Sequence, residues 1–201
     1  MAKYPPTTVR ARPWSWRTAA GIALFAALLP AGIPTFAHGE PPAAAEYAVK
    51  AAFLYNFAKF VEWPGDAFSG TASPIVICVL GEDPFGDSLR SLKGKSVNGR
   101  PLVIRYAATI EELDRCHLLF VSSSEKANLT KILQATKYLS LLTVGDTNGF
   151  ARDGGIINMV KEESRIGIEV NLEAAQRSRL KISSKLLALS KIVKPGRRQG
   201  E

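Results

Sequence analysis

Hydrophobic side chains occupy most positions of the segment Glu46–Pro64, which contains no glycine and no internal proline. A backbone of this composition is predicted to be helical. At about 100° per residue, its apolar residues form two adjoining stripes that cover more than half of the helix surface, and Lys50 lies among them. We therefore expect this helix to pack against neighbours on more than one side. It should end at Trp63, because the residue before a proline disfavours helical torsion angles.

After Pro64, short apolar runs alternate with segments that begin with helix-capping residues. The apolar runs are continuous and rich in β-branched residues, which favours strands buried on both faces, as in a parallel sheet. The predicted strands cover residues 74–81, 101–106, 117–121 and 139–144, and the predicted helices cover residues 84–92, 109–115 and 122–138. This alternation of strands and helices indicates an α/β fold with a mostly parallel sheet.

Near the C-terminus the pattern changes to two strands joined by a short link. Residues 156–161 and 165–171 are predicted to form an antiparallel hairpin at the edge of the sheet. Side chains of the second strand alternate between two faces. One face carries Ile166, Ile168 and Val170, and the other carries Arg165, Gly167, Glu169 and Asn171. Asn171 is expected to cap a short helix, and a serine at 183 or 184 to cap a closing helix over 185–193.

The first 37 residues have the layout of a secretory signal peptide. Basic residues without acidic ones precede an apolar run of about eleven residues, which is shorter than the roughly 20 that span a membrane. Small residues at 35 and 37 then provide a cleavage site. We expect residues 1–37 to be removed on export to the periplasm, 38–45 to form a flexible lead, 46–193 to form a single domain and 194–201 to form a basic tail.

The net charge of +8 says little about the folded part of the chain. Part of this charge lies in the leader, and much of the rest lies between Lys191 and Glu201. The body is therefore nearly neutral, which together with export argues against nucleic acid as a partner. Cys78 and Cys116 form an even pair in an oxidising compartment, which indicates one disulfide. Two buried free thiols are the alternative.

Motifs for catalysis, metal binding and phosphate binding are lacking in the sequence. It contains no phosphate-binding loop, no G-x-S-x-G turn and no metal-ligand spacing. We therefore predict no enzyme activity, no catalytic residue, no metal and no cofactor. The loop 145–150 follows a predicted strand at the edge where open α/β sheets bind ligands. Asp146, Asn148 and Phe150 are the residues of a candidate small-molecule pocket there, although Gly, Asp and Asn also suit a plain turn.

Several blocks of sequence resemble one family of exported proteins, the YfiR-like family. The most specific is K-A-A-F-L-Y-N-F-A-K-F-V-E-W-P at residues 50–64, followed by I-V-I-C-V-L-G, D-P-F-G and V-N-G-R-P-L-V-I-R. Further blocks are C-H-L-L-F-V-S, L-L-T-V-G-D, G-G-I-I-N-M-V, I-E-V-N-L-E-A-A and L-K-I-S-S-K-L-L-A-L. The resemblance covers almost all of residues 46–193.

This resemblance implies a three-layer α/β sandwich, a homodimer and a regulatory role. The best-understood relatives bind the periplasmic sensor domain of an inner-membrane diguanylate cyclase and repress it, which lowers cyclic di-GMP and biofilm formation, until an outer-membrane lipoprotein sequesters them. Cys78 and Cys116 match one disulfide of such relatives by position. A second cysteine pair that some relatives carry late in the chain is absent here.

The leading hypothesis is therefore a periplasmic, non-enzymatic protein that binds a membrane diguanylate cyclase. Partner contacts are expected first on the hairpin and second on the polar arc and end of the first helix. The candidates are Met159, Arg165, Glu169 and Asn171, and then Asn56, Lys59, Glu62 and Trp63. A solute-binding domain that uses the rim 145–150 is the alternative from another class, and a hydrolase that depends on Asp146 is a third.

Overall fold

The computed structural model describes residues 42–163 and 165–196. The expected signal peptide, residues 38–41 of the expected lead and residues 197–201 of the expected tail lie outside this part of the chain. Residues 42–45 were also expected in the lead, but they form the first turn of helix α1. No helix within the described residues is long and apolar enough to cross a membrane.

Helix α1 spans Pro42–Phe60 and buries one side in the core, whereas packing on more than one side was expected. The expectation that it continues to Trp63 is wrong, because Val61–Glu62 leaves the helix as the short strand β1. β1 pairs in antiparallel fashion with β9, Lys181–Ile182, and the Phe60 carbonyl accepts a hydrogen bond from the Ser183 amide at 2.9 Å. Pairing with β9, which is distant in sequence, therefore ends the helix before the proline does.

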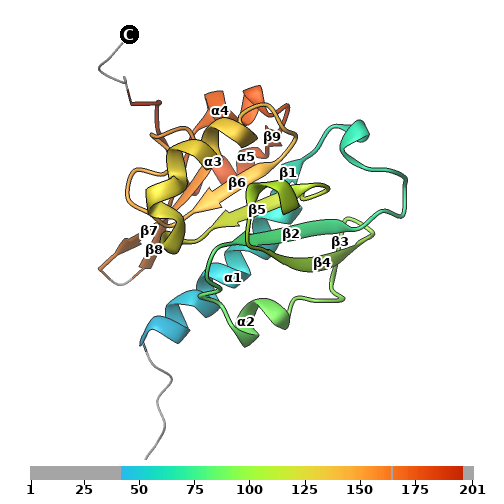
Figure 1. The fold of residues 1–201 in the computed structure, drawn as a ribbon, viewed down its shortest axis with the longest axis horizontal. Coiled ribbons are helices and arrows are strands. Elements are labelled where there is room, and N and C mark those ends of the chain that lie inside the picture. The colour runs from blue at the N-terminus through green and yellow to red at the C-terminus, as the bar shows by residue number, and fades with distance from the viewer. Residues whose placement is uncertain (1–41, 164, 197–201) are drawn as a thin grey trace, which may run out of the picture. The chain divides into compact units, whose positions relative to one another are not determined.

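Eight strands form a mixed, mostly parallel sheet in the order β10-β8-β7-β6-β5-β2-β4-β3 (Figure 1). Their bounds are β2 Ile75–Leu80, β3 Ser96–Val97, β4 Arg100–Ala107, β5 Leu118–Val121, β6 Leu142–Gly145, β7 Ile157–Glu162, β8 Arg165–Val170 and β10 Lys191–Ile192. Strands β4, β2, β5, β6 and β7 are parallel to their neighbours in the centre of the sheet. The α/β fold and the antiparallel β7–β8 hairpin are thus confirmed, with β10 lying outside β8.

Helices cover both faces of the sheet and bury two separate hydrophobic cores. Helix α1 lies on one face with α2 (Asp87–Arg90), α4 (Leu172–Arg177) and α5 (Ser184–Leu187). Helix α3 (Leu129–Thr136) lies on the other, together with the 3-10 turns η2 (Ile110–Leu113) and η3 (Ser123–Asn128). A further 3-10 turn, η1, covers Gly65–Ala67. These layers form the three-layer arrangement that the sequence predicts.

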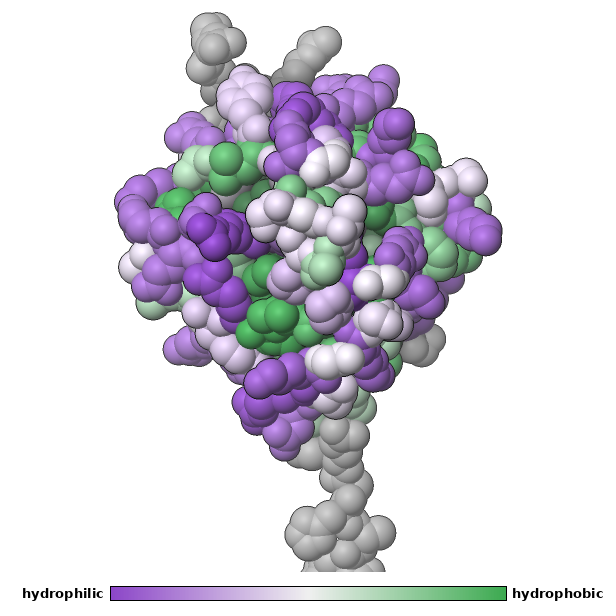
Figure 2. All heavy atoms as spheres, turned by 90° about the vertical axis from the view of Figure 1, so that its right-hand side faces the viewer, coloured by the Kyte–Doolittle hydropathy of each residue, from purple (hydrophilic) through white to green (hydrophobic). Residues whose placement is uncertain are grey.

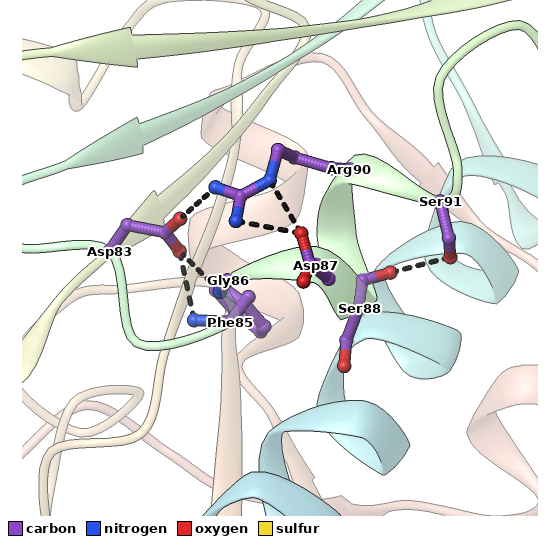
Figure 3. Close-up of polar contacts among 7 residues, drawn as sticks. All are labelled: Asp83, Phe85, Gly86, Asp87, Ser88, Arg90 and Ser91. Carbon is purple, nitrogen blue, oxygen red and sulfur yellow. Dashed lines mark hydrogen bonds and ion pairs between the residues drawn. The ribbon is translucent and has the colours of Figure 1, made fainter.

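Four predicted helices are shorter than expected. The helix predicted over 109–115 is only the 3-10 turn η2, and the helix predicted over 122–138 is α-helical only in α3, after the 3-10 turn η3. The helix predicted from Pro84 begins at Asp87 as α2, because Asp83 caps the preceding loop instead: its carboxylate accepts the amides of Phe85 at 2.8 Å and Gly86 at 3.4 Å (Figure 3). Arg90 then reaches back to the Asp87 carboxylate at 2.8 Å. The closing helix ends at Leu187, because the chain then turns into strand β10 beside β8.

The face turned to the viewer in Figure 2 carries hydrophilic side chains for the most part, with smaller hydrophobic areas between them. A soluble domain normally exposes apolar side chains scattered in this way. The candidate functional surface lies where α1 meets the β7–β8 hairpin.

Candidate functional site

A groove of about 610 Å³ runs between the N-terminal half of α1 and the β7–β8 hairpin. Its apolar part comes from both elements, and its rim is charged. The lining consists of Ala45, Glu46, Val49, Phe53, Lys161, Glu162, Glu163, Arg165 and Ile166. Val49 is a large apolar residue of α1 and is nevertheless 48% exposed. We call this surface the α1–hairpin groove.

A buried polar network lies beside the groove and joins α1 to the carboxyl end of β6. Lys50 is only 3% exposed, and its ammonium group contacts Glu46 at 2.6 Å and Asp146 at 2.7 Å. Tyr47 donates its hydroxyl hydrogen to the same Asp146 oxygen, Oδ2, at 2.9 Å. Lys161 of β7 contacts Glu46 at 2.7 Å. The network therefore ties the groove's helical wall to the sheet and to the hairpin.

The charged groups of this network shift one another's pKa values. Burial by itself would lower the pKa of Lys50, but hydrogen bonds to Asp146 and Glu46 and the charge of Asp146 outweigh burial and raise it. Burial would raise the pKa of Glu46, but hydrogen bonds to Lys161 and Lys50 outweigh it and lower that pKa. Burial and then the Asp146 carboxylate raise the pKa of Tyr47. Lys50 and Glu46 are thus held charged, and Tyr47 is held neutral.

The first-choice partner residues on the hairpin divide between surface and core. Arg165 is exposed and lines the groove, where it contacts Glu162 at 2.6 Å. Met159 and Asn171 are fully buried, at 0% exposure each, so their side chains do not reach the surface. Asn171 instead caps α4, as predicted, by accepting the Ala174 amide at 3.0 Å, and its amide group donates to the Ala151 carbonyl.

Met159 is buried because of the register in which the two hairpin strands pair, and the sequence alone does not determine that register. Met159 stands opposite Ile168 on the face that α1 covers. Glu169 lies on the other face, opposite Asn158, and its side chain is 13% exposed. Two cations approach its carboxylate, Arg152 at 3.5 Å and Lys191 at 3.6 Å. Glu169 and Arg165 are therefore the surface residues of this set, at opposite ends of one strand.

The second-choice residues lie at the other end of α1 from the groove. Lys59 and Glu62 are exposed and Asn56 is partly exposed. Trp63 is half-buried and donates from Nε1 to the His117 carbonyl at 3.0 Å. The structure therefore gives Trp63 a packing role next to the sheet and does not bring this set together with Arg165.

The candidate ligand pocket at 145–150 is filled by its own side chains. The Phe150 ring is 0% exposed, and a Cβ atom added at Gly145 or Gly155 would overlap it. Asp146 is taken up by Lys50 and Tyr47, although its Oδ1 atom is buried without a partner among the described residues. Asn148 alone of the three is exposed. The loop is thus a packed turn next to the network.

The predicted disulfide between Cys78 and Cys116 is present. It joins β2 to the residues just before β5, and both cysteines are buried on the α3 face, at 0% and 9% exposure. Beside it, the His117 ring accepts the Val76 amide at Nδ1, 3.2 Å away, and its Nε2 lies 3.1 Å from the Ala67 carbonyl. Both ring nitrogens of this histidine are therefore used within the fold. The described residues contain no group of three or more His, Cys, Asp or Glu side chains placed to hold a metal ion.

Sequence reasoning missed the groove and the Lys50–Asp146 contact. The available signal was Lys50 itself, a single charged residue among the apolar stripes of a helix, because a lysine at such a position needs a buried partner. The groove gave no comparable signal. Val49 and Phe53 read as core residues of the helix, but Val49 is exposed and Phe53 is only partly buried.

A comparison with protein families gives a match over most of the chain. The family model described as DUF4154, YfiR/HmsC-like, matches residues 47–191. This range contains nearly all of the described residues and the lining of the groove except Ala45 and Glu46. A comparison with curated proteins gives no match.

Solved structures give distant similarities. A conserved domain protein from Vibrio cholerae is 11% identical, with a TM-score of 0.49, over 73% of this chain and 59% of that one. The ligand-free, open structure of a substrate-binding protein with adhesive properties from Clostridium difficile is 13% identical, with a TM-score of 0.46, over 65% of this chain and 57% of that one. The chain thus spans less than two thirds of either protein.

Proposed function

Because the chain belongs to the YfiR/HmsC-like family, we propose that it is a periplasmic regulator without enzyme activity. Its partner is the periplasmic sensor domain of an inner-membrane diguanylate cyclase. Binding represses the cyclase, which lowers cyclic di-GMP and reduces biofilm formation. The protein acts as a homodimer and is itself sequestered by an outer-membrane lipoprotein. The family and the disulfide support a location outside the cytoplasm, since disulfides persist in oxidising compartments.

The α1–hairpin groove is the observation that carries this proposal. Exposed apolar side chains that are bordered by charged ones are typical of surfaces that bind other proteins. Val49, Phe53 and Ile166 provide the apolar part, and Lys161 and Arg165 stand at the rim. We propose that the sensor domain inserts apolar side chains between α1 and the hairpin.

The network around Lys50 supports the same use of the surface. It links the groove to the sheet through Glu46 and Asp146, so the wall of the groove is held in place before a partner arrives. A surface that is already ordered loses less conformational entropy on binding. Repression then follows if the groove binds one conformation of the sensor domain more tightly than the other.

The absence of enzyme activity is part of the proposal. Asp146 and His117, which are the residues that a hydrolytic site could use, are engaged inside the fold by Lys50, Tyr47, Val76 and Ala67. A measurable hydrolytic turnover that the substitution Asp146→Ala abolishes would support the hydrolase alternative.

The solute-binding alternative has less support from the loop that suggested it. Phe150 and Asp146 are occupied by packing and ion pairing, which leaves Asn148 as the exposed member. A thermal-shift screen against small metabolites tests this alternative, and reproducible stabilisation by several degrees would favour it.

A cellular experiment tests the regulatory proposal. Deletion of the gene is expected to raise cyclic di-GMP and surface attachment, and expression of the wild-type chain to restore both. A Val49→Asp variant should fail to restore them, because it places a charge in the groove. Leu139→Asp is the matched control, because Leu139 is also 48% exposed and lies outside the groove. Unchanged cyclic di-GMP after deletion would refute the regulatory role.

A further inference from the structure

Positive charge is concentrated in the last part of the described domain. Residues 174–196 contain six basic residues and no acidic residue, whereas residues 42–173 contain 14 basic and 16 acidic residues. The six are Arg177, Arg179, Lys181, Lys185, Lys191 and Lys194. This segment includes β9 and α5, which lie on the α1 side of the sheet, and β10, which is an edge strand of the sheet.

Two large aliphatic side chains protrude from the same segment. Leu189 is 77% exposed and Ile192 is 55% exposed. Leu189 follows α5 in a turn that continues the helical hydrogen bonding, since its amide donates to the Leu186 carbonyl at 3.1 Å. Lys185 stands four residues before Leu189 and is exposed as well. Side chains at this spacing on a helical turn are neighbours.

The two side chains of strand β10 point to opposite faces of the sheet. Ile192 stands opposite Val170, whose buried side chain packs on the α1 side, so Ile192 lies on that side too. Lys191 points the other way and contacts Glu169 at 3.6 Å. Val193, which follows the strand, is buried, and Lys194 beyond it is exposed.

The exposed residues Lys185, Leu189, Ile192 and Lys194 come from one short stretch of chain that runs from α5 to just beyond β10, and we call them the C-terminal patch. Within the part of the chain that the structure describes, Arg179 pairs with Asp66 and Lys191 with Glu169. Lys185 and Lys194 have no such acidic neighbour there. Their charges are available to an external anion.

We propose that the C-terminal patch docks on the surface of an anionic lipid bilayer. Cations alone would suit any polyanion, but the two protruding aliphatic side chains can enter the boundary between headgroups and acyl chains while the lysines meet the headgroups. Lysine stems also cover apolar surface while their ammonium groups stay in water. This docking does not depend on the identity of the protein partner.

The patch and the α1–hairpin groove lie at opposite ends of β8. Arg165 begins this strand beside the groove, and Val170 ends it beside Ile192. Six residues of strand span roughly 17 Å between their ends. In Figure 1, α4 and α5 accordingly lie at the top, and the strands β7 and β8 lie at the left. A chain docked by the patch would keep its groove free for another protein.

Vesicle sedimentation of the purified protein tests this inference. We expect binding to vesicles of phosphatidylglycerol mixed with phosphatidylethanolamine, little binding to phosphatidylcholine vesicles, and release by added salt. Lys185→Gln with Lys194→Gln should lower the partition coefficient about 25-fold, at about fivefold per lysine. Leu189→Ser with Ile192→Ser should also lower it, by about tenfold or more.

A matched control uses the opposite face. Lys126→Gln, Lys137→Gln and Tyr138→Ser alter two exposed lysines and a 71% exposed aromatic residue near α3, and this variant should bind vesicles as the wild type does. Circular dichroism confirms that each variant is folded. Equal binding to anionic and neutral vesicles, or an equal loss in the control variant, would overturn the proposal. Full binding by the Leu189/Ile192 variant would also overturn it, because charge alone would then hold the protein on any polyanionic surface.

Discussion

Replacement of Lys50 by methionine is the perturbation for which the structure predicts the largest local effect. Methionine fills a similar volume but leaves the Asp146 carboxylate without its cation. The Asp146 side chain is 4% exposed, and Tyr47 would remain as the donor to its Oδ2 atom. Glu46 is less affected, because it keeps Lys161 at 2.7 Å.

The expected destabilisation follows from the burial of Asp146. Removing one partner of a buried ion pair costs about 3–5 kcal/mol, because the remaining charge has neither water nor a counter-ion. Replacing both partners by uncharged residues of similar volume is often nearly neutral. The double variant Lys50→Met with Asp146→Asn should therefore be more stable than Lys50→Met alone, by about 2 kcal/mol or more.

Urea denaturation at pH 7 with the disulfide intact measures these differences as changes in the free energy of unfolding. The wild type, both single variants and the double variant form a double-mutant cycle. If Lys50→Met lost less than about 1 kcal/mol, or if the two substitutions were simply additive, Lys50 and Asp146 would not form the buried pair that we describe. Glu46→Gln serves as a milder comparison, with an expected loss near 1 kcal/mol.

Three further predictions concern the core and its pH dependence. Cys78→Ala with Cys116→Ala should lower the free energy of unfolding by about 4 kcal/mol in the chain-entropy model, given the sequence separation of 38 residues; an unchanged urea midpoint would contradict this. Phe150→Ala should lower it by about 3–5 kcal/mol, because the fully buried ring fills the space beside Gly145 and Gly155, and a loss below about 1 kcal/mol would mean that the ring is not packed there. Burial lowers the pKa of the His117 imidazole below its usual value of about 6.5, so the unfolded chain binds the proton more readily and stability should fall as the pH drops from about 6.5 towards 5. A His117→Gln variant should lack that slope in a series of thermal melts, and an equal slope in both proteins would assign it to other groups.

The order of elements could be predicted from the sequence because each depends on local pattern. The continuous apolar run Ile75–Leu80 is buried along its whole length, as a central parallel strand requires. Asn171 and Ser183 cap α4 and α5 through their own side chains. The disulfide could be predicted from the cysteine count and from the family resemblance.

The errors arose where contacts distant in sequence decide the outcome. Val61–Glu62 is a strand because β9 pairs with it, and no local signal at Trp63 reveals that. Met159 is buried because β7 turns its side chain towards α1, which depends on the register of the sheet. From its sequence context alone, Asp146 suits a turn. Its contact with Lys50 depends on the position of α1 in the fold.

Isothermal titration calorimetry tests the central claim most directly, with the purified chain and the periplasmic domain of a diguanylate cyclase from the same organism. We predict binding by the wild type, a loss of affinity of about tenfold or more in Val49→Asp, and unchanged affinity in the equally exposed control Leu139→Asp. No binding by the wild type, or an equal loss in both variants, would contradict a regulator that acts through the α1–hairpin groove.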